Sequence, residues 1–313
     1  MSPQRNKSNE ASTNKPRNHI VKDATSPYTF TYTQYGQNKS ITVNQTPDDD
    51  TWPGGALWDI GALLAKALVM LNKPPPSSSS SSGKKEAFVP RLRSPGIWPA
   101  SWKDCTILEL GCGVGLTGLV GAQLGAKLTL LTDLDVVVEK VTKPNVELNK
   151  KEFGMGQKVL AMPLCWDNED DEAACRKILE SCSQTKKGGS TRKLKKKGKG
   201  QTKPNEGDSI ISSDPSIILI GDVAYQHKPG APSHFDILMS TLLKFATTRE
   251  TVVMFGTRMR MPASSDLLDM FREHFDEVIE PVQAHEIDHS FHSSSLGRNS
   301  LITLHVFKRK VEK

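Results

Sequence analysis

The chain has 313 residues, enough for one large domain or two small ones around a buried core. No apolar run approaches the roughly 20 residues that span a bilayer, and the N-terminus has no signal-peptide core. We therefore expect a soluble, cytoplasmic protein with no membrane partner. The five cysteines are odd in number and lack C-x-x-C spacing, which argues against disulfides and a zinc ribbon.

The net charge of +6 arises in one segment, because residues 186–203 hold nine Lys or Arg and no acid. Subtracting these nine from the 41 basic residues leaves 32, against 35 acidic ones. The remainder is slightly acidic, so we expect no nucleic acid at the active site. Within the segment, Lys193–Lys197 resembles a nuclear import signal, which gives a nuclear location as an alternative; a disordered insertion is the other interpretation.

The N-terminal part predicts a hairpin and a buried helix. Tyr28–Tyr35 and Lys39–Val43 alternate apolar and polar residues around a glycine turn, the pattern of a β-hairpin. The stretch from Ala56 to Leu71 is apolar nearly all round, as a buried helix requires.

Composition divides the chain into a tail and one interrupted domain. Residues 1–26 are polar and predict a disordered tail. Residues 27–313 form the domain, with low-complexity insertions at about 74–100, which includes six consecutive serines, and at 183–213.

From Cys105 onward, apolar strands alternate with helices. The predicted strands are Cys105–Leu110, Lys127–Thr132, Val159–Leu164, Ser216–Gly221, Thr251–Gly256, Phe275–Glu280 and Leu301–Phe307. The predicted helices are Leu116–Leu124, Asp135–Val141, Asp171–Ser181, His234–Thr247 and Ser264–His274. This alternation is typical of a doubly wound α/β fold whose seven-stranded sheet is mostly parallel. The short gap before the last strand predicts that this strand is antiparallel.

The strand ending at Leu110 runs into a loop with Gly111, Cys112, Gly113 and Gly115. Glycines let the backbone approach a ligand, and the helix that follows adds N–H donors. The same stretch also satisfies the dinucleotide pattern G-x-G-x-x-G. Glu109 argues against a dinucleotide, because a carboxylate there would repel a pyrophosphate. It suits S-adenosylmethionine, which carries an ammonium and a sulfonium and has no phosphate.

Three further residues follow strands at the edge where ligands of such sheets bind. Asp133 can accept hydrogen bonds from both ribose hydroxyls, although capping the next helix is the alternative. Trp166 lies where an adenine would stack and Asp167 could reach a base amine, although a tryptophan is more often part of a core. Asp222 opens the tetrapeptide Asp-Val-Ala-Tyr at the methyl-transfer position; a simple turn is the alternative.

His285-Glu286-Ile287-Asp288-His289 fits the zinc-protease pattern H-E-x-x-H. That pattern needs a helix presenting both histidines on one face. Pro281 precedes this stretch and serines follow it, so we expect a solvated loop and no metal site.

These motifs resemble the seven-β-strand, Rossmann-like protein methyltransferases of the methyltransferase-like lysine group. The resemblance covers roughly residues 28–309 and is carried by the motifs Gly54-Gly55-Ala56-Leu57-Trp58-Asp59, Leu108–Leu116, Leu131–Leu134, Asn145–Asn149, Trp166 and Gly221–Tyr225. It implies that Trp58, Gly111 to Gly113, Asp133, Trp166 and Gly221 contact the cofactor. It also implies that Asp222 and Tyr225 lie at the methyl-transfer end.

By this resemblance the chain is a lysine methyltransferase acting on a translation factor or chaperone, and we expect it to be a monomer. Methylation of a small amine or of a protein N-terminus is one alternative on the same fold. A scaffold that binds the cofactor without turnover is another. A nucleic-acid methyltransferase is disfavoured, because the usual Asn/Asp-Pro-Pro-aromatic tetrapeptide is replaced by Asp222-Val223-Ala224-Tyr225.

Overall fold

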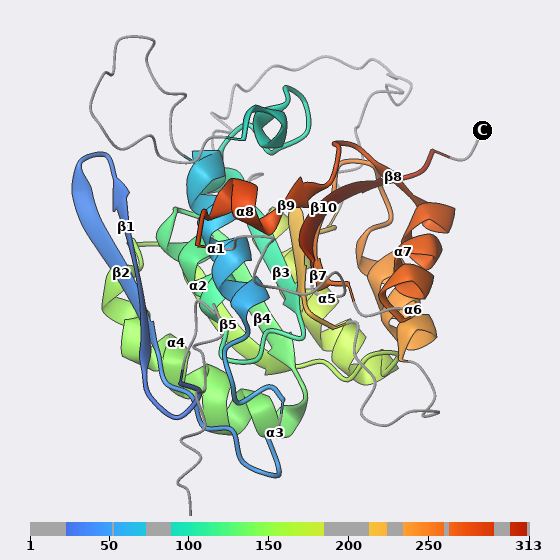
Figure 1. Cartoon of the computed structure of the whole chain (residues 1–313). Coiled ribbons are helices and arrows are strands. Elements are labelled where there is room, and N and C mark those ends of the chain that lie inside the picture. Colours follow the sequence, from blue (N-terminus) through green and yellow to red (C-terminus); the bar gives the residue numbers. More distant parts are fainter. Residues whose placement is uncertain are drawn as a thin grey trace, which may run out of the picture.

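The computed structural model describes residues 23–51, 53–72, 89–184, 213–223, 234–259, 263–290 and 301–311. Two predicted insertion tracts, the serine run and the basic run, lie outside these ranges, as do most of the predicted tail and Tyr225. In the part described, a central sheet is covered by helices on both faces, and a separate hairpin stands beside it (Figure 1).

The large sheet has eight strands, and their order along it is β5-β4-β3-β6-β7-β10-β8, with β9 pairing to β10. The strands are β3 (Thr106–Leu110), β4 (Leu128–Asp133), β5 (Lys158–Pro163), β6 (Ile217–Gly221), β7 (Val252–Arg258), β8 (Phe275–Glu277), β9 (Val282–Gln283) and β10 (Ile302–Arg309). The first five pair in parallel, whereas β10 is antiparallel to β7, β8 and β9. The mostly parallel sheet and its antiparallel last strand are confirmed.

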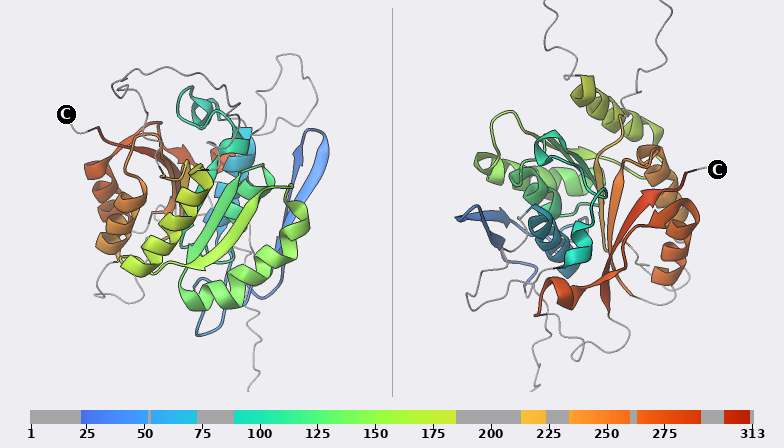
Figure 2. Two further views of the ribbon diagram at one scale, coloured as in Figure 1. Left: turned by 180° about the vertical axis from the view of Figure 1, so that it is seen from behind. Right: turned by 90° about the horizontal axis from the view of Figure 1, so that it is seen from above.

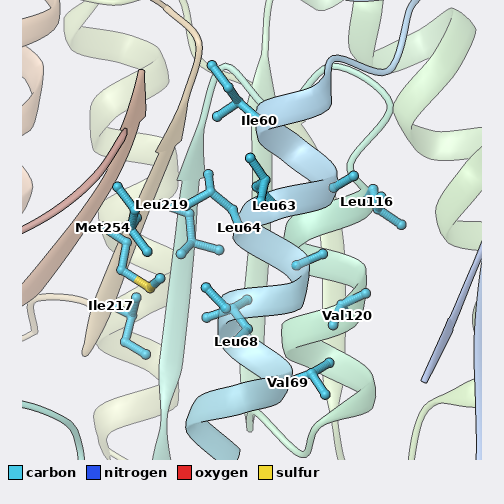
Figure 3. Close-up of a cluster of buried hydrophobic side chains, with 14 of the residues drawn as sticks. Ile60, Leu63, Leu64, Leu68, Val69, Leu116, Val120, Ile217, Leu219 and Met254 are labelled. Carbon is cyan, nitrogen blue, oxygen red and sulfur yellow. The ribbon is translucent and has the colours of Figure 1, made fainter. Parts of the chain in front are cut away.

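Two apolar cores sandwich the sheet. One lies against α1 (Asp59–Asn72) and α2 (Leu116–Gln123), and the other against α5 (Glu169–Gln184), α6 (Phe235–Phe245) and α7 (Ala263–His274). Figure 2 shows these helices on opposite faces. In Figure 3 the side chains of α1 fill the space between α2 and strands β6 and β7, as expected for a helix that is apolar nearly all round.

The hairpin of β1 (Tyr28–Gln34) and β2 (Gln37–Val43) is confirmed as a separate two-stranded sheet. Its buried residues, such as Phe30, Tyr32 and Ile41, join the core around α1 and α2. The Tyr32 hydroxyl donates a 2.8 Å hydrogen bond to Gln123 in α2. A helix, α4 (Lys143–Asn149), lies behind β2 and follows a short helix, α3 (Asp135–Val137), and a π-helical turn at Val138–Thr142.

The connection before β10 was predicted incorrectly. Instead of a solvated loop, the structure has the short strand β9 and the one-turn helix α8 (Ala284–Ile287), in which Ala284 and Ile287 are buried. Arg91 fixes this turn by donating to the Glu280 and Pro281 carbonyls and pairing with Glu286. The two apolar residues of this four-residue helix produce no recognisable periodicity, which explains why a loop was predicted.

Residues 89–104, just beyond the serine run, form two short 3-10 turns, Pro90–Arg93 and Trp102–Asp104. Val89, Leu92 and Ile97 are buried in the core on the α1 side. None of the described helices is long and apolar enough to cross a membrane.

Candidate functional site

A cavity of about 420 Å³ opens at the carboxyl ends of β3, β4 and β6. This volume is in the range of small-molecule sites. The predicted site residues that line it are Trp58, Glu109, Gly111, Cys112, Gly113, Asp133, Trp166, Gly221 and Asp222. Gly115 does not line the cavity but caps the N-terminus of α2, and Tyr225 lies outside the described residues.

The loop after β3 requires its glycines. Gly111, Gly113 and Gly115 have φ of 67°, 52° and 80°, a left-handed region that other residues rarely adopt. A Cβ on Gly113 would also lie 2.9 Å from the carbonyl oxygen of Gly54. The loop is therefore shaped by backbone conformation and by the close approach of the 46–58 segment that precedes α1.

Side chains from the π-helical turn and α4 hold this loop from behind. The buried Thr142 hydroxyl donates to the Gly113 carbonyl at 2.7 Å and lies 3.6 Å from the Cys112 sulfur. The Asn145 amide donates to the Val114 carbonyl at 3.0 Å. A π-helical turn often marks a functional site, and here it places Thr142 beneath the loop.

Glu109 is 5% exposed and lies under the N-terminus of α2. Its Oε2 accepts a 2.9 Å hydrogen bond from the Gly118 N–H. Burial raises the pKa of Glu109 to about 8, and the nearby Asp133 contributes to the rise, while hydrogen bonds from Gly118 and Thr117 oppose it. The carboxylate thus borders the cavity in an environment that favours its charged form only when a positive charge comes near.

Asp133 is the last residue of β4, and its carboxylate is hydrogen-bonded to the glycine loop after β3. Its Oδ2 accepts the Gly113 N–H at 2.8 Å, and its Oδ1 accepts the Leu134 N–H at 2.8 Å. Burial raises its pKa, and these two hydrogen bonds lower it. Each carboxylate oxygen has a further lone pair, so the side chain can still accept hydrogen bonds from a ligand.

Both tryptophans line the cavity. Trp58 is 39% exposed and its indole donates to the Pro53 carbonyl at 3.2 Å, so it is not a core residue. Trp166 reaches Gly111, where its Cζ2 would lie 3.5 Å from an added Cβ. The carboxylate of Asp167 instead turns to α6, where it accepts from Ser240 and pairs with Lys244. Asp167 is not among the residues that line the cavity.

Asp222 follows β6 directly and is 8% exposed. Its φ of 52° is unusual for a residue other than glycine. The Asp222 N–H donates to the Gly256 carbonyl in β7 at 2.9 Å, which fixes the backbone across the two strands. Such strain in a cavity wall is typical of functional positions.

Further lining residues were not predicted from the sequence. They are Asp50, Thr51, Pro53, Gly54, Ala56, Leu57, Gly61, Val114, Leu116, Thr117, Leu134, Val137, Leu164, Cys165, Val223, His234 and Ile237. Those before Trp58 belong to the segment that crosses the glycine loop, where the Gly54-Gly55 pair was the available signal. His234 and Ile237 come from the start of α6, which carries no recognisable ligand motif.

The sequence profile of a family described as lysine methyltransferase matches residues 37–180. This range contains the hairpin's second strand, the 46–58 segment, the glycine loop, Asp133 and Trp166. Over these residues, which are somewhat less than half of the chain, the sequence is similar to the lysine methyltransferase family.

Curated relatives match parts of this chain. The protein N-lysine methyltransferase METTL21A of Mus musculus is 28% identical over 173 residues, which are 55% of this chain and 58% of the relative. The ribosomal protein L11 methyltransferase of Ruminiclostridium cellulolyticum is 42% identical over 48 residues, 15% of each chain. The matches therefore span less than two thirds of either relative.

Solved structures align over more of the chain. A putative S-adenosylmethionine-dependent methyltransferase from Streptococcus mutans covers 90% of this chain and 55% of its own, at 11% identity and a TM-score of 0.45. A putative methyltransferase complexed with SAH has 11% identity, a TM-score of 0.46 and coverage of 90% and 56%.

The residues that line the cavity fit S-adenosylmethionine. The glycine loop leaves space that a Cβ would fill, and the cavity is of suitable size. Glu109, Asp133 and Asp222 place carboxylates around it, as a ligand with a net positive charge requires. Asp133 and the two tryptophans offer acceptors for hydroxyls and flat surfaces for a purine.

The H-E-x-x-H stretch has other partners. Glu286 pairs with Arg91 at 2.6 Å, and Asp288 pairs with Lys66 at 2.8 Å. Among the residues that the structure describes, no group of three His, Cys, Asp or Glu could hold a metal ion.

Proposed function

We propose that this chain transfers a methyl group from S-adenosylmethionine to the side-chain amine of a lysine in a protein substrate. The observation that carries the proposal is Asp222, a carboxylate fixed in a left-handed backbone conformation in the wall of the cofactor cavity. The family description and the name of METTL21A support lysine as the acceptor. The names of METTL21A, a protein N-lysine methyltransferase, and of the ribosomal protein L11 methyltransferase both refer to protein substrates. By the family resemblance, the protein substrate we propose is a translation factor or chaperone.

S-adenosylmethionine supplies a methyl group already activated by its sulfonium, so the protein mainly has to bind and align the acceptor. A lysine ammonium has no lone pair, and deprotonating it at neutral pH costs about 4.6 kcal/mol from a pKa of about 10.4. Burial in an apolar channel and a nearby positive charge both favour the neutral amine. Most of this cost can therefore be met by the environment of the amine.

We assign the orientation of the amine to Asp222, because its carboxylate is the hydrogen-bond acceptor at the end of β6. The exposed Trp58 forms an aromatic wall of the same cavity. By the family resemblance, Tyr225 completes the channel. In this proposal Glu109 and Asp133 bind the cofactor and take no part in proton transfer.

The test incubates the full chain with methyl-labelled cofactor and a cell extract, then hydrolyses the labelled proteins. Discrete labelled bands that yield Nε-methyllysine support the proposal. Label on an α-amine or on small molecules supports the alternative acceptors, and cofactor binding without any label supports a scaffold.

Asp222→Asn is the matched variant for this assay. It keeps the size and the hydrogen-bonding capacity of the side chain and removes the charge. We expect turnover to fall by about 10²-fold or more, with cofactor affinity within about threefold of the native protein. Full turnover and unchanged substrate affinity in Asp222→Ala would overturn the assignment.

A further inference from the structure

The outer edge of β2 is covered by side-chain amides. Asn149 accepts from the Thr42 N–H at 3.0 Å and donates to the Thr42 carbonyl at 2.7 Å. Asn145 does the same for Asn44, at 2.8 and 3.1 Å. The Gln123 amide donates to the Ser40 carbonyl at 3.1 Å. On the edge of β2 that faces away from β1, backbone groups of alternate residues are therefore hydrogen-bonded to side-chain amides.

This alternation determines which backbone groups of β1 point outward. In an antiparallel pair, directly opposite residues either exchange both backbone hydrogen bonds or both point away from each other. Thr42 lies opposite Thr29, and Ser40 lies opposite Thr31. Because Thr42 and Ser40 point outward on β2, the N–H and C=O groups of Thr29 and Thr31 point outward on β1. Thr33 follows by the same two-residue period.

The outer edge of β1 lacks the side-chain amides that cover the outer edge of β2 in the described part of the chain. Within the described part of the chain, β1 has β2 as its only strand neighbour, and no side-chain amide covers it as Asn145 and Asn149 cover β2. A row of unpaired N–H and C=O groups is a template for pairing with another extended segment.

A groove of about 920 Å³ lies along this edge. Its walls are the residues of β1, including Thr29, Thr31 and Thr33, residues 38–40 of β2 beside the hairpin turn, and residues of α1 and of the 287–289 stretch at the end of α8. On the α1 side, Ala62, Lys66, Val69 and Met70 line the groove. Its lining is about equally polar and apolar, as a segment with alternating side chains requires.

The groove begins close to the cofactor cavity. Tyr28, the first residue of β1, lines it, and burial together with Asp288 and Asp59 nearby raises the pKa of the Tyr28 hydroxyl. Asp59 follows Trp58, which lines the cofactor cavity. Along α1, Gly61 lines the cofactor cavity and the next residue, Ala62, lines the groove, so a chain bound along β1 lies against the helix that borders the cavity.

We propose that an extended segment of the protein substrate binds in this groove by adding a strand to the free edge of β1. The backbone groups of Thr29, Thr31 and Thr33 pair with its main chain, and the groove accepts alternate side chains. This inference rests on the proposed function for the identity of the occupant. The strand pairing itself depends only on the hairpin and can be tested without methyl transfer.

The first experiment uses a capped hexapeptide of alternating valine and threonine as the probe. Its matched control carries N-methyl groups on alternate amides and cannot pair through that edge. We expect the peptide to slow hydrogen exchange at the Thr29, Thr31 and Thr33 amides of the full chain, and the N-methylated peptide to have no such effect. No protection at millimolar peptide would overturn the proposal.

The same measurement detects competing occupants. If these three amides are already protected in the full chain and exchange rapidly after deletion of residues 1–22, the chain's own tail occupies the edge. Protection that increases with protein concentration would instead identify a second copy of the chain. Either result would overturn the assignment to a substrate.

The second experiment introduces Thr31→Pro, which removes one outward N–H but no hydrogen bond to β2, because Thr31 and Ser40 are a non-bonded pair. With extract proteins as methyl acceptors, we expect the KM for the acceptor to rise about tenfold, with kcat and cofactor affinity unchanged. Thr31→Val keeps the N–H and should change KM less than twofold. Equal KM for Thr31→Pro and the native chain would overturn the proposal.

The two proposals fail in different ways. Loss of the edge pairing with intact lysine methylation removes only the docking site. Peptide protection without any methyl transfer would leave a binding edge on a protein whose proposed activity is wrong.

Discussion

At the residue scale, Glu109 is the group whose charge depends on the cofactor. Its pKa of about 8 means that it is largely protonated at pH 7 when no cation is near. A positively charged ligand in the cavity favours the carboxylate and lowers this pKa. Cofactor binding at pH 7 should therefore release up to about one proton, and affinity should rise with pH until about pH 8.

Isothermal calorimetry in phosphate and in Tris at pH 7 measures this release, because the two buffers differ in ionisation enthalpy. Glu109→Gln should reduce the number of protons released. Identical binding enthalpies for the native chain in both buffers would show that no proton is released and would contradict this role of Glu109.

Glu109 also makes folding stability depend on pH. Its folded pKa of about 8 lies above the unfolded value of 4.5. Between these values the folded state holds a proton that the unfolded chain has lost, so the contribution of Glu109 to the free energy of unfolding decreases as pH rises. Urea denaturation at pH 5, 6.5 and 8 should show this decrease, and Glu109→Gln should make the profile flatter. An unchanged slope in the variant would contradict the raised pKa.

Alanine variants of two glycines that both have a positive φ distinguish the cost of the backbone conformation from an effect on ligand binding. Gly96 and Gly113 have φ of 76° and 52°, but a Cβ on Gly96 meets nothing within 4 Å. Gly96→Ala should lower the free energy of unfolding by about 1–2 kcal/mol and leave cofactor affinity unchanged. Gly113→Ala adds a clash with Gly54 and should weaken cofactor binding at least about tenfold. Equal cofactor affinities in the two variants, by calorimetry, would contradict this role of Gly113.

At the element scale, Asn149 joins α4 to β2. Its amide makes both hydrogen bonds to Thr42 and a third, of 2.8 Å, to the Asn145 carbonyl. Asn149→Ala leaves partly buried backbone groups without partners, so the free energy of unfolding should fall by about 2–3 kcal/mol. The exposed Glu147→Ala on the same helix should change it by less than about 0.5 kcal/mol. Thermal denaturation of the two variants compares them, and similar midpoints would show that water replaces the Asn149 amide.

The elements that the sequence predicts well are those with a long regular pattern. The apolar strands β3, β4, β6 and β7 and the helix α1 follow their predicted ranges to within about three residues. The π-helical turn and α8 could not be foreseen, because each depends on one or two contacts from distant residues. Thr142 is placed by hydrogen bonding to Gly113, and α8 by Arg91.

At the scale of the whole molecule, some site residues can be predicted because they follow strands of the sheet, and others cannot because distant contacts place them. The glycines, Asp133 and Asp222 follow strands directly, so the sheet alone brings them together. The segment from Asp50 to Gly54 reaches the cavity only because β2 and α1 are anchored elsewhere, and local patterning does not reveal that. The same holds for Asp167, whose orientation depends on Ser240 and Lys244 in α6.

Among the ion pairs that join the family-matched part of the chain to the rest, one is largely buried and lies beside the cavity. Asp59 at the start of α1 and Arg258 at the end of β7 lie 3.0 Å apart, with side chains 6% and 16% exposed. Residues 37–180 contain Asp59, whereas Arg258 belongs to the C-terminal half of the sheet. The pair therefore holds the helix that follows Trp58 against the strand beside Asp222.

Arg258→Met should lower the free energy of unfolding by about 3 kcal/mol, because it leaves the Asp59 carboxylate buried without its guanidinium. Asp59→Asn in the same chain should recover part of that loss, since a neutral amide is less costly to bury. A double-mutant cycle measured by urea denaturation should give a coupling of about 1–3 kcal/mol. If the two losses simply add, the Asp59–Arg258 interaction contributes nothing, and the packing of α1 on β6 and β7, with the other ion pairs such as Lys66–Asp288, keeps the two parts together.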